Sequence, residues 1–275
     1  MTKIGVIVQA RMGSSRLPDK VLMGLPFGSE ISILEHIVKA VSSVKEVGAI
    51  CIATSIAPEN DLIDERFKNT DVLVFRGDEN NVLNRVTKAC EKMKIDHTVN
   101  LTGDNPVVDP TVLKELIDFH INNDYDRSVT EGLPLGTNIS IVKYSALKDA
   151  DENTNSEYDK EHVEPYVINN NQYSNGVLSI NRYKDIEGLR LTVDYPSDYA
   201  LLNMIFCSFK GGNTIKLQDI LELYRDNSWI QEVNNGNYQK RSYPSVNEEL
   251  RDAAAILRKL EMNRVADKIL DEIDK

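Results

Sequence analysis

Three cationic side chains stand close together near the start of the chain, directly after an apolar run. These are Arg11, Arg16 and Lys20. Three small residues lie between them, namely Gly13, Ser14 and Ser15. Small residues let backbone N–H groups approach the oxygens of an anion, and the cations neutralise its charge. The stretch therefore predicts a loop that binds a polyphosphate, although its glycine spacing matches neither a Walker A loop nor a GxGxxG turn.

Two aspartates further along the chain each follow an apolar run and precede a proline. Asp104 lies in the segment 102–106, and Asp194 lies in the segment 190–196. Where such runs are strands that end at one edge of a sheet, the two carboxylates can hold one Mg²⁺, which prefers oxygen ligands and bridges to phosphates. Each aspartate alone is equally typical of a turn or a helix cap. Together with the cationic loop, the pair predicts a magnesium site.

The composition is that of a soluble globular protein with an acidic balance. The 275 residues are 41% hydrophobic and 27% charged, which suits one large domain or one domain with an insertion. The net charge of −11 argues against a general nucleic-acid binder. Three widely spaced cysteines predict neither a disulfide framework nor a zinc site. Without a signal-like start or an apolar stretch of about 20 residues, we expect a cytoplasmic protein with no membrane partner.

An alternation of strands and helices positions these residues in the first half of the chain. Apolar runs predict strands at 3–9, 49–54, 72–76 and 97–102. Helical spacing of apolar residues predicts helices at 31–44, 59–68, 81–93 and 111–122. This order implies right-handed crossovers and a parallel sheet with helices on both faces. The cationic loop and Asp104 then follow strands directly, where open α/β sheets bind their ligands.

The pattern becomes richer in strands after residue 124. Further strands are predicted at 128–130, 138–144, 176–181 and 189–193, and helices at 145–150, 162–169, 196–209 and 217–224. The polar stretch 151–161 predicts a surface loop, and residues 247–275 predict a helical tail. The middle part therefore suits a β element added to the sheet.

Residues 8–22 closely resemble the opening of the acylneuraminate and Kdo cytidylyltransferase superfamily, above all its spore-coat polysaccharide branch. Further matches follow in order at 75–78, 82–85, 101–106, 161–163 and 191–199, and weakly at 233–240. The resemblance implies an α/β, three-layer Rossmann-like nucleotide-diphospho-sugar transferase fold with a mostly parallel sheet. It also implies a catalytic domain at 1–246, with a β-rich dimerisation element inserted at about 128–181, and a helical C-terminal extension at 247–275.

The activity that the resemblance implies is Mg²⁺-dependent transfer of CMP from CTP to a sugar, with release of pyrophosphate, by a homodimer. It implies catalytic roles for Arg11, Lys20, Asp104 and Asp194, with the two aspartates as metal ligands. The implied CTP-binding residues are Ala10, Arg11, Gly13, Ser14, Ser15, Arg16, Lys20, Arg76, Arg85, Thr102 and Gly103. The implied acceptor-binding residues are Asn138, Ser140, Glu161 and His162.

The acceptor half departs from the pattern of this family. Relatives usually carry acidic residues where this chain has Asn138 and Ser140, and arginine where it has Lys160. A less negative pocket predicts an acceptor different from that of the typical branch, and we expect an anionic one such as a nonulosonic acid. Two other functions stay open. One is a nucleotidyltransferase of this fold with another base or acceptor, and the other is a non-catalytic nucleotide-sugar binder or scaffold.

Overall fold

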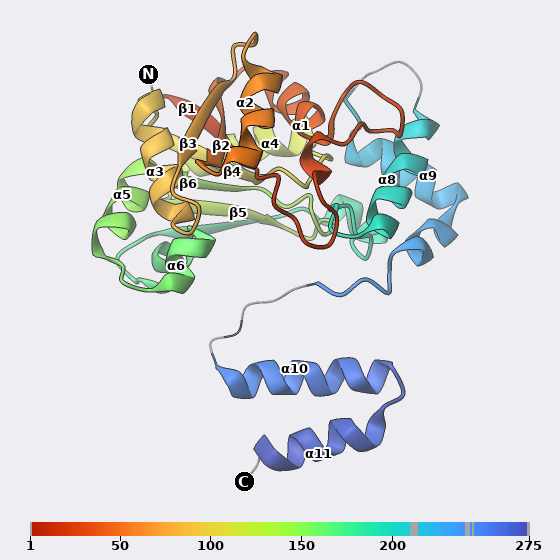
Figure 1. The fold of residues 1–275 in the computed structure, drawn as a ribbon. Coiled ribbons are helices and arrows are strands. Elements are labelled where there is room, and N and C mark those ends of the chain that lie inside the picture. The colour runs from red at the N-terminus through yellow and green to blue at the C-terminus, as the bar shows by residue number, and fades with distance from the viewer. Residues whose placement is uncertain (1, 210–213, 240–242, 244, 274–275) are drawn as a thin grey trace. The chain divides into compact units, whose positions relative to one another are not determined.

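The computed structural model describes residues 2–209, 214–239, 243 and 245–273 (Figure 1). Contacts between residues divide the chain into two compact units, Met1–Gly236 and Asn237–Lys275. The boundary between the units precedes the one drawn from the sequence at 246/247. All candidate site residues belong to the first unit.

The first unit is built on a seven-stranded sheet with the strand order β3-β2-β1-β4-β6-β5-β7 (Figure 1). The strands are β1 (Ile4–Gln9), β2 (Val47–Ser55), β3 (Leu73–Gly77), β4 (His97–Thr102), β5 (Arg127–Glu131), β6 (Ser140–Lys143) and β7 (Asn175–Ser179). The pairs β1–β2, β1–β4, β2–β3 and β5–β7 are parallel, whereas β6 runs antiparallel to β4 and β5. The predicted mostly parallel sheet is confirmed. The predicted β-rich element supplies β5, β6 and β7, which extend the same sheet.

Helices cover both faces of this sheet. They are α1 (Ile33–Ser42), α2 (Asp61–Phe67), α3 (Val82–Met93), α4 (Pro110–Asn122), α5 (Tyr144–Asn153), α6 (Glu157–His162), α7 (Pro165–Asn169), α8 (Pro196–Ser208) and α9 (Leu217–Asp226). Because side chains alternate along a strand, Val6 and Val8 of β1 pack into one hydrophobic cluster and Ile7 into another. The first cluster includes residues of α1, α2, α4, α8 and α9, and the second includes residues of α3, α5 and α7. The predicted three-layer architecture is confirmed.

Local capping explains where several helices begin. Ser32 forms a capping box with Glu35 at the start of α1, so this helix begins two residues later than predicted. The Asn81 side chain accepts a hydrogen bond from the backbone N–H of Asn84 at the start of α3. Asp109 caps α4 in the same way, directly before Pro110.

The predicted strand at 189–193 is wrong. Arg190 forms a single isolated bridge with Leu135, and the backbone N–H groups of the next residues bond to two different segments of the chain. That of Leu191 donates to the Leu135 carbonyl oxygen and that of Val193 to the Asp104 carbonyl oxygen, both at 2.8 Å. No ladder continues, although Leu191 and Val193 are fully buried. The apolar run at 189–193 therefore reflects the burial of its side chains and not their position in a strand.

The predicted loop at 151–161 and helix at 162–169 are both wrong in part. The helices α5 and α6 occupy much of the first segment, and Ser156 accepts a hydrogen bond from the Asp159 N–H to start α6. The second segment is broken at Val163, which has a φ of 70°. The short helix α7 begins at Pro165, the first helical position, where the missing N–H of proline costs no hydrogen bond within the helix.

The second unit is a pair of helices, α10 (Val246–Lys259) and α11 (Asn263–Ile273). The two helices contact one another, and each buries one alanine, Ala254 and Ala266. The predicted helical tail is confirmed over its described residues, with a break at Glu261, where φ is 61°. Among the described residues, no helix combines the length and the apolar character needed to cross a bilayer.

Two buried histidines, His97 of β4 and His120 of α4, are in contact with one another. His97 Nδ1 lies 2.8 Å from His120 Nε2, and His120 Nδ1 lies 2.8 Å from Ser128 Oγ. Burial lowers the pKa of both rings, and the neighbouring His97 further lowers the pKa of His120 to about 4. Both rings are therefore neutral in the folded protein at pH 7.

This pair predicts a loss of stability in mild acid. The unfolded chain binds a proton at His120 near pH 6.5, whereas the folded protein resists protonation down to about pH 4. The stabilisation is therefore complete above pH 6.5 and falls as the pH is lowered through this window, by up to about 3 kcal/mol. Urea unfolding at pH 7 and pH 5 measures this loss. His120→Gln is expected to lose less stability between the two pH values than the wild type, whereas the exposed control His162→Gln loses as much as the wild type. Equal losses in the wild type and His120→Gln would contradict the interpretation.

Candidate active site

The cationic loop starts where β1 ends, and backbone hydrogen bonds fix its first turn. The Ala10 N–H donates to the Ala53 carbonyl oxygen at 3.2 Å, and the Met12 N–H donates to Asn60 Oδ1 at 2.8 Å. Asn60 is itself buried and was not singled out by the sequence. In the loop, Arg11, Gly13, Ser15 and Arg16 are exposed and Ser14 is half-buried. Its cations are thus presented at the carboxyl edge of the sheet, as predicted.

Lys20 lies at the centre of the site. It begins the 3₁₀ turn Lys20–Leu22, and its side chain is only 9% exposed. Its Nζ donates to Asp104 Oδ2 at 2.8 Å, to Asp194 Oδ1 at 3.0 Å and to the carbonyl oxygen of Val193 at 2.7 Å. The two aspartates singled out by the sequence therefore converge on one point, which the lysine ammonium group occupies.

Asp194 is surrounded by three cations. Its Oδ1 accepts hydrogen bonds from Lys20 and from Arg16 Nη2 at 2.8 Å, and its Oδ2 accepts one from Arg190 Nη2 at 2.7 Å. Burial alone would raise the pKa of the Asp194 carboxyl. The three cations, of which Lys20 has the largest effect, outweigh the effect of burial and lower this pKa. Asp194 is therefore ionised in the folded protein at neutral pH.

A second layer of polar contacts holds the Asp194 segment to the start of α8. Asp198 is fully buried and accepts hydrogen bonds from Arg190 Nε and Asn234 Nδ2, both at 2.9 Å. It also accepts the backbone N–H groups of Asp194 and Tyr195, both at 2.9 Å. The sequence analysis missed Arg190, Asp198 and Asn234. Asp198 stands three residues after the N-cap residue Tyr195 and accepts its backbone N–H, which is one half of a capping box, and an acidic residue at this spacing could have revealed it.

Gly103 allows the end of β4 to lie against the end of β1. Its N–H donates to the Gln9 carbonyl oxygen at 2.7 Å, and a Cβ at this position would lie 2.8 Å from the Ala10 Cβ. Thr102 Oγ1 donates to Asp104 Oδ1 at 2.7 Å. Ala10, Thr102 and Gly103 therefore help to place Asp104 beside the cationic loop.

The two arginines predicted to lie near a nucleotide differ in their surroundings. Arg76 holds the loop after β2, because its Nη2 donates to the Ala57 carbonyl oxygen at 2.9 Å and its side chain pairs with Asp61. Arg85 is 4% exposed, and its Nη1 donates to the carbonyl oxygens of two residues of the loop after β3, those of Asp78 and Glu79. Within the described part of the chain, the Arg85 Nε has no hydrogen-bond partner.

Arg85 is also close enough to the exposed Arg11 for the two charges to repel. Burial lowers the pKa of Arg85, and the charge of Arg11 lowers it further. Two neighbouring guanidinium groups, one of them buried with an unused donor, form an arrangement that an anion would stabilise.

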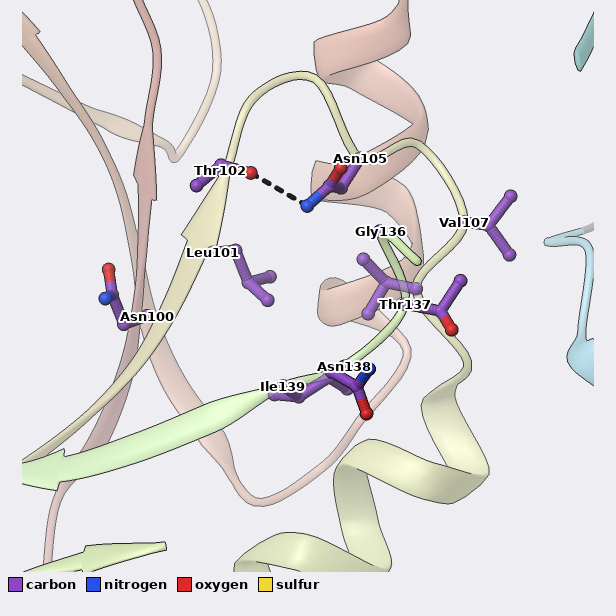
Figure 2. Close-up of a pocket in the computed structure, with 10 residues that line it drawn as sticks. Asn100, Leu101, Thr102, Asn105, Val107, Gly136, Thr137, Asn138 and Ile139 are labelled. Atoms are coloured by element: carbon purple, nitrogen blue, oxygen red, sulfur yellow. Dashed lines mark hydrogen bonds between the residues drawn. The ribbon is translucent and has the colours of Figure 1, made fainter. Parts of the chain in front are cut away.

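A pocket of about 70 Å³ lies where β4 and the segment that leads into β6 diverge (Figure 2). This segment, 132–139, is the connection of the antiparallel β5–β6 pair. Ten neutral residues line the pocket: Asn100, Leu101, Thr102, Asn105, Val107, Val108, Gly136, Thr137, Asn138 and Ile139. Asn105 donates through Nδ2 to Thr102 Oγ1 at 2.8 Å, while its buried Oδ1 has no donor among the described residues.

Of the four predicted acceptor-binding residues, Asn138 alone lines this pocket. Ser140 Oγ donates to Glu164 Oε1 at 2.5 Å, behind the pocket wall formed by Asn100. Glu161 and His162 are exposed at the end of α6. The pocket and these three side chains are therefore separate features of the structure.

The carboxylates of Asp104 and Asp194 fit a divalent ion that binds together with a phosphate ligand. In the part of the chain that the structure describes, no three or more His, Cys, Asp or Glu side chains gather in a group that could hold a metal. Asp104 and Asp194 nevertheless direct one oxygen each to the same point. Mg²⁺ is commonly held through one or two carboxylates together with substrate phosphates and water, so two carboxylates beside the cationic loop suffice.

The comparisons with known sequences agree on one family. The family described as cytidylyltransferase matches residues 5–243. An uncharacterised protein of Methanocaldococcus jannaschii is 32% identical over 247 residues, which cover 90% of this chain and 100% of that protein. The spore coat polysaccharide biosynthesis protein SpsF of Bacillus subtilis is 33% identical over 210 residues, which cover 75% of this chain and 87% of that protein.

Solved structures are similar as well. A cytidylyltransferase from Leptospira borgpetersenii is 27% identical and has a TM-score of 0.77, over 88% of this chain and 100% of that one. A CMP:2-keto-3-deoxy-manno-octonic acid synthetase complexed with CTP has a TM-score of 0.58 over 75% of this chain and 99% of that one. Its identity of 14% shows a shared fold alone.

Proposed function

Because the chain belongs to the cytidylyltransferase family, we propose that it transfers CMP from CTP to a hydroxyl group of a sugar and releases pyrophosphate. Family membership confirms the resemblance found in the opening motif. The observation that carries the proposal is the convergence of Lys20, Asp104 and Asp194 beside the exposed Arg11 and Arg16. Cations for a triphosphate and carboxylates for its metal thus meet at one edge of the sheet.

In this proposal the cationic loop binds the triphosphate. Arg11, Arg16 and Lys20 hold its oxygens and stabilise the charge that develops on pyrophosphate as it leaves. The oxygen of the acceptor hydroxyl bonds to the α-phosphorus and gives its proton to water, while the bond from that phosphorus to the oxygen that bridges to the β-phosphorus breaks and pyrophosphate leaves with that oxygen. Mg²⁺, held by Asp104 and Asp194, would supply further positive charge at the transferring phosphoryl group. Arg85, buried beside Arg11, adds positive charge on the far side of the loop.

The pocket between β4 and the 132–139 segment would receive the acceptor. Its amide and hydroxyl side chains suit the hydroxyl and amide groups of a sugar, and the buried Asn105 Oδ1 offers an unused acceptor to a donor of that sugar. We propose a sugar acid such as a nonulosonic acid, whose carboxylate would lie outside this neutral pocket. A non-catalytic binder is less well supported, because binding alone needs no converging pair of carboxylates. The homodimer and the cytoplasmic location stay predictions.

Pyrophosphate release tests the proposed reaction. The purified protein is incubated with Mg²⁺, with each of the four nucleoside triphosphates in turn, and with a panel of sugar acids and neutral amino sugars. Release with CTP and one sugar acid is expected. Release with a neutral amino sugar in preference to every sugar acid would overturn the proposed acceptor. Release with a different triphosphate would overturn the proposed base.

Arg11 provides a test of triphosphate binding that leaves the fold intact. Its side chain is exposed and its guanidinium group makes no ion pair within the described residues, so Arg11→Met is not expected to change the unfolding temperature. We expect the KM for CTP to rise at least tenfold, because one charge-assisted contact to phosphate is lost. Arg225→Met, an exposed arginine of α9, serves as the matched control. An unchanged KM in Arg11→Met would remove Arg11 from the proposed site.

A further inference from the structure

The point between Asp104 and Asp194 is already occupied by a positive charge of the protein itself. The Lys20 ammonium group contacts both carboxylates, and Arg16 donates to the same Asp194 oxygen. Lys20 Nζ lies 2.8 Å from the Asp104 oxygen and 3.0 Å from the Asp194 oxygen. A divalent ion bound by the same two oxygens would therefore lie next to this ammonium group. Because like charges repel strongly at such short separations, the ion and the ammonium group cannot share this position.

The six charged side chains of the cluster comprise a buried pair, two cations of the loop after β1, and the two carboxylates that these cations contact. Arg190 and Asp198 are buried and paired with one another, and Asp198 also holds two backbone N–H groups. These two belong to the framework. Lys20 and Arg16 lie on the loop after β1, and Arg16 is one-third exposed. A turn of either side chain toward a ligand in front of the loop would break its contacts with the carboxylates, and for Lys20 also its bond to the Val193 carbonyl oxygen, but it would break no strand pairing.

The charges of the two loop cations and of the two carboxylates balance. Lys20 and Arg16 together carry two positive charges, and Asp104 and Asp194 carry two negative charges. If both cations leave the carboxylates, one divalent ion restores neutrality. A triphosphate in front of the loop offers the oxygens that would draw the cations away.

We propose that Lys20 and Arg16 are exchangeable counter-ions, which neutralise Asp104 and Asp194 in the free protein and give them up to one divalent metal ion when a triphosphate binds. The proposal rests on the proposed function for the identity of the triphosphate. It implies that the free protein binds metal weakly and that nucleotide and metal strengthen one another's binding by the same factor. Lys20 thus keeps the site closed to metal until the nucleotide arrives.

Metal binding to the free protein provides the direct test. Mn²⁺ is the probe, and its free concentration is followed by electron paramagnetic resonance in the absence of nucleotide. Lys20→Met is expected to bind Mn²⁺ at least tenfold more tightly than the wild type. Lys114→Met, which removes an exposed lysine of α4, is the matched control and is expected to behave as the wild type. Equal Mn²⁺ affinity in Lys20→Met and the wild type would overturn the proposal.

Two further variants test whether the gain of Mn²⁺ affinity is independent of misfolding and whether the ion binds at the two aspartates. Arg16→Met removes a more exposed side chain, so it is expected to fold, and it is expected to gain Mn²⁺ affinity in the same direction by a smaller factor. Adding Asp104→Asn to Lys20→Met is expected to abolish the gain, since it removes one of the two carboxylates. A gain that survives in this double variant would place the ion elsewhere and overturn the proposal.

Calorimetry with CTP in the presence of EDTA separates this inference from the proposed function. Asp104→Asn is expected to bind metal-free CTP severalfold more tightly than the wild type, because Lys20 is then less strongly held by the protein. A gain of Mn²⁺ affinity in Lys20→Met with no CTP binding by any variant would retain the counter-ion exchange and overturn the proposed nucleotide. Binding of CTP without a gain of Mn²⁺ affinity in Lys20→Met would retain the proposed nucleotide and overturn the counter-ion exchange.

Discussion

Replacing Asp104 by asparagine is expected to lower the rate of CTP-dependent pyrophosphate release by a factor of about 10² to 10³. The carboxylate provides one of the two oxygens that converge on Lys20 Nζ, and an amide neither neutralises a cation nor binds a divalent ion as strongly. The fold should remain intact, because the Asp104 side chain is 25% exposed and Lys20 keeps Asp194 and the Val193 carbonyl oxygen. We expect a stability change of no more than about 1 kcal/mol.

Initial rates at saturating CTP, together with urea unfolding, measure the two effects. Asp118→Asn makes the same chemical change at an exposed site of α4, where the carboxylate pairs only with Lys114 among the described residues, and it should leave the rate unchanged. A rate in Asp104→Asn equal to that of the wild type would remove Asp104 from the reaction. A rate lost together with the fold would show that its role is structural.

Replacing Asp198 by asparagine is expected to lower the free energy of unfolding by about 3–5 kcal/mol. The side chain is fully buried, and its loss of charge removes one of the counter-ions of the buried Arg190. Two backbone N–H groups and the Asn234 amide also lose part of their acceptor. Since these contacts fix the Asp194 segment, pyrophosphate release should fall as well.

Urea unfolding at pH 7 measures the loss of stability. The matched control is Asp185→Asn, because Asp185 is exposed and lies 4.0 Å from an exposed arginine, Arg225. Exposed ion pairs contribute little, so the control should change stability by less than about 0.5 kcal/mol. If Asp198→Asn lost less than about 1 kcal/mol, the buried cluster would not be what holds α8 to the site.

The alternation of strands and helices could be predicted because buried parallel strands are continuous apolar runs. The strands β1 to β4 match the predicted ranges closely, and the helices between them differ mainly at their ends. The same signal failed at 189–193, where Leu191 and Val193 are buried without a strand partner on either side. A single sequence does not distinguish a run that is buried from one that is also paired.

The residues proposed to contact the triphosphate and its metal could be predicted, and the buried layer that supports them could not. Arg16, Lys20, Asp104 and Asp194 follow strands or apolar runs, so topology alone places them at one edge. Arg190 and Asn234 lie 44 residues apart and meet only through tertiary packing. Burial makes such polar residues important, and nothing in the local sequence distinguishes them from surface residues.

The reversed direction of β6 has a consequence for how such an enzyme can diversify. The chain from 132 to 139 reaches the carboxyl edge of β4 as the tip of a hairpin, with both ends fixed by the pairing of β5 with β6. It forms one wall of the pocket, whereas the cationic loop, Asp104 and Asp194 come from other parts of the chain. A change at this tip that keeps the backbone bonds of Leu135 to residues 189 and 191 would reshape the pocket and leave the cationic loop and the two aspartates in place. Under the proposed function, a change in this one loop therefore adapts the enzyme to a new acceptor without rebuilding the site that binds the triphosphate.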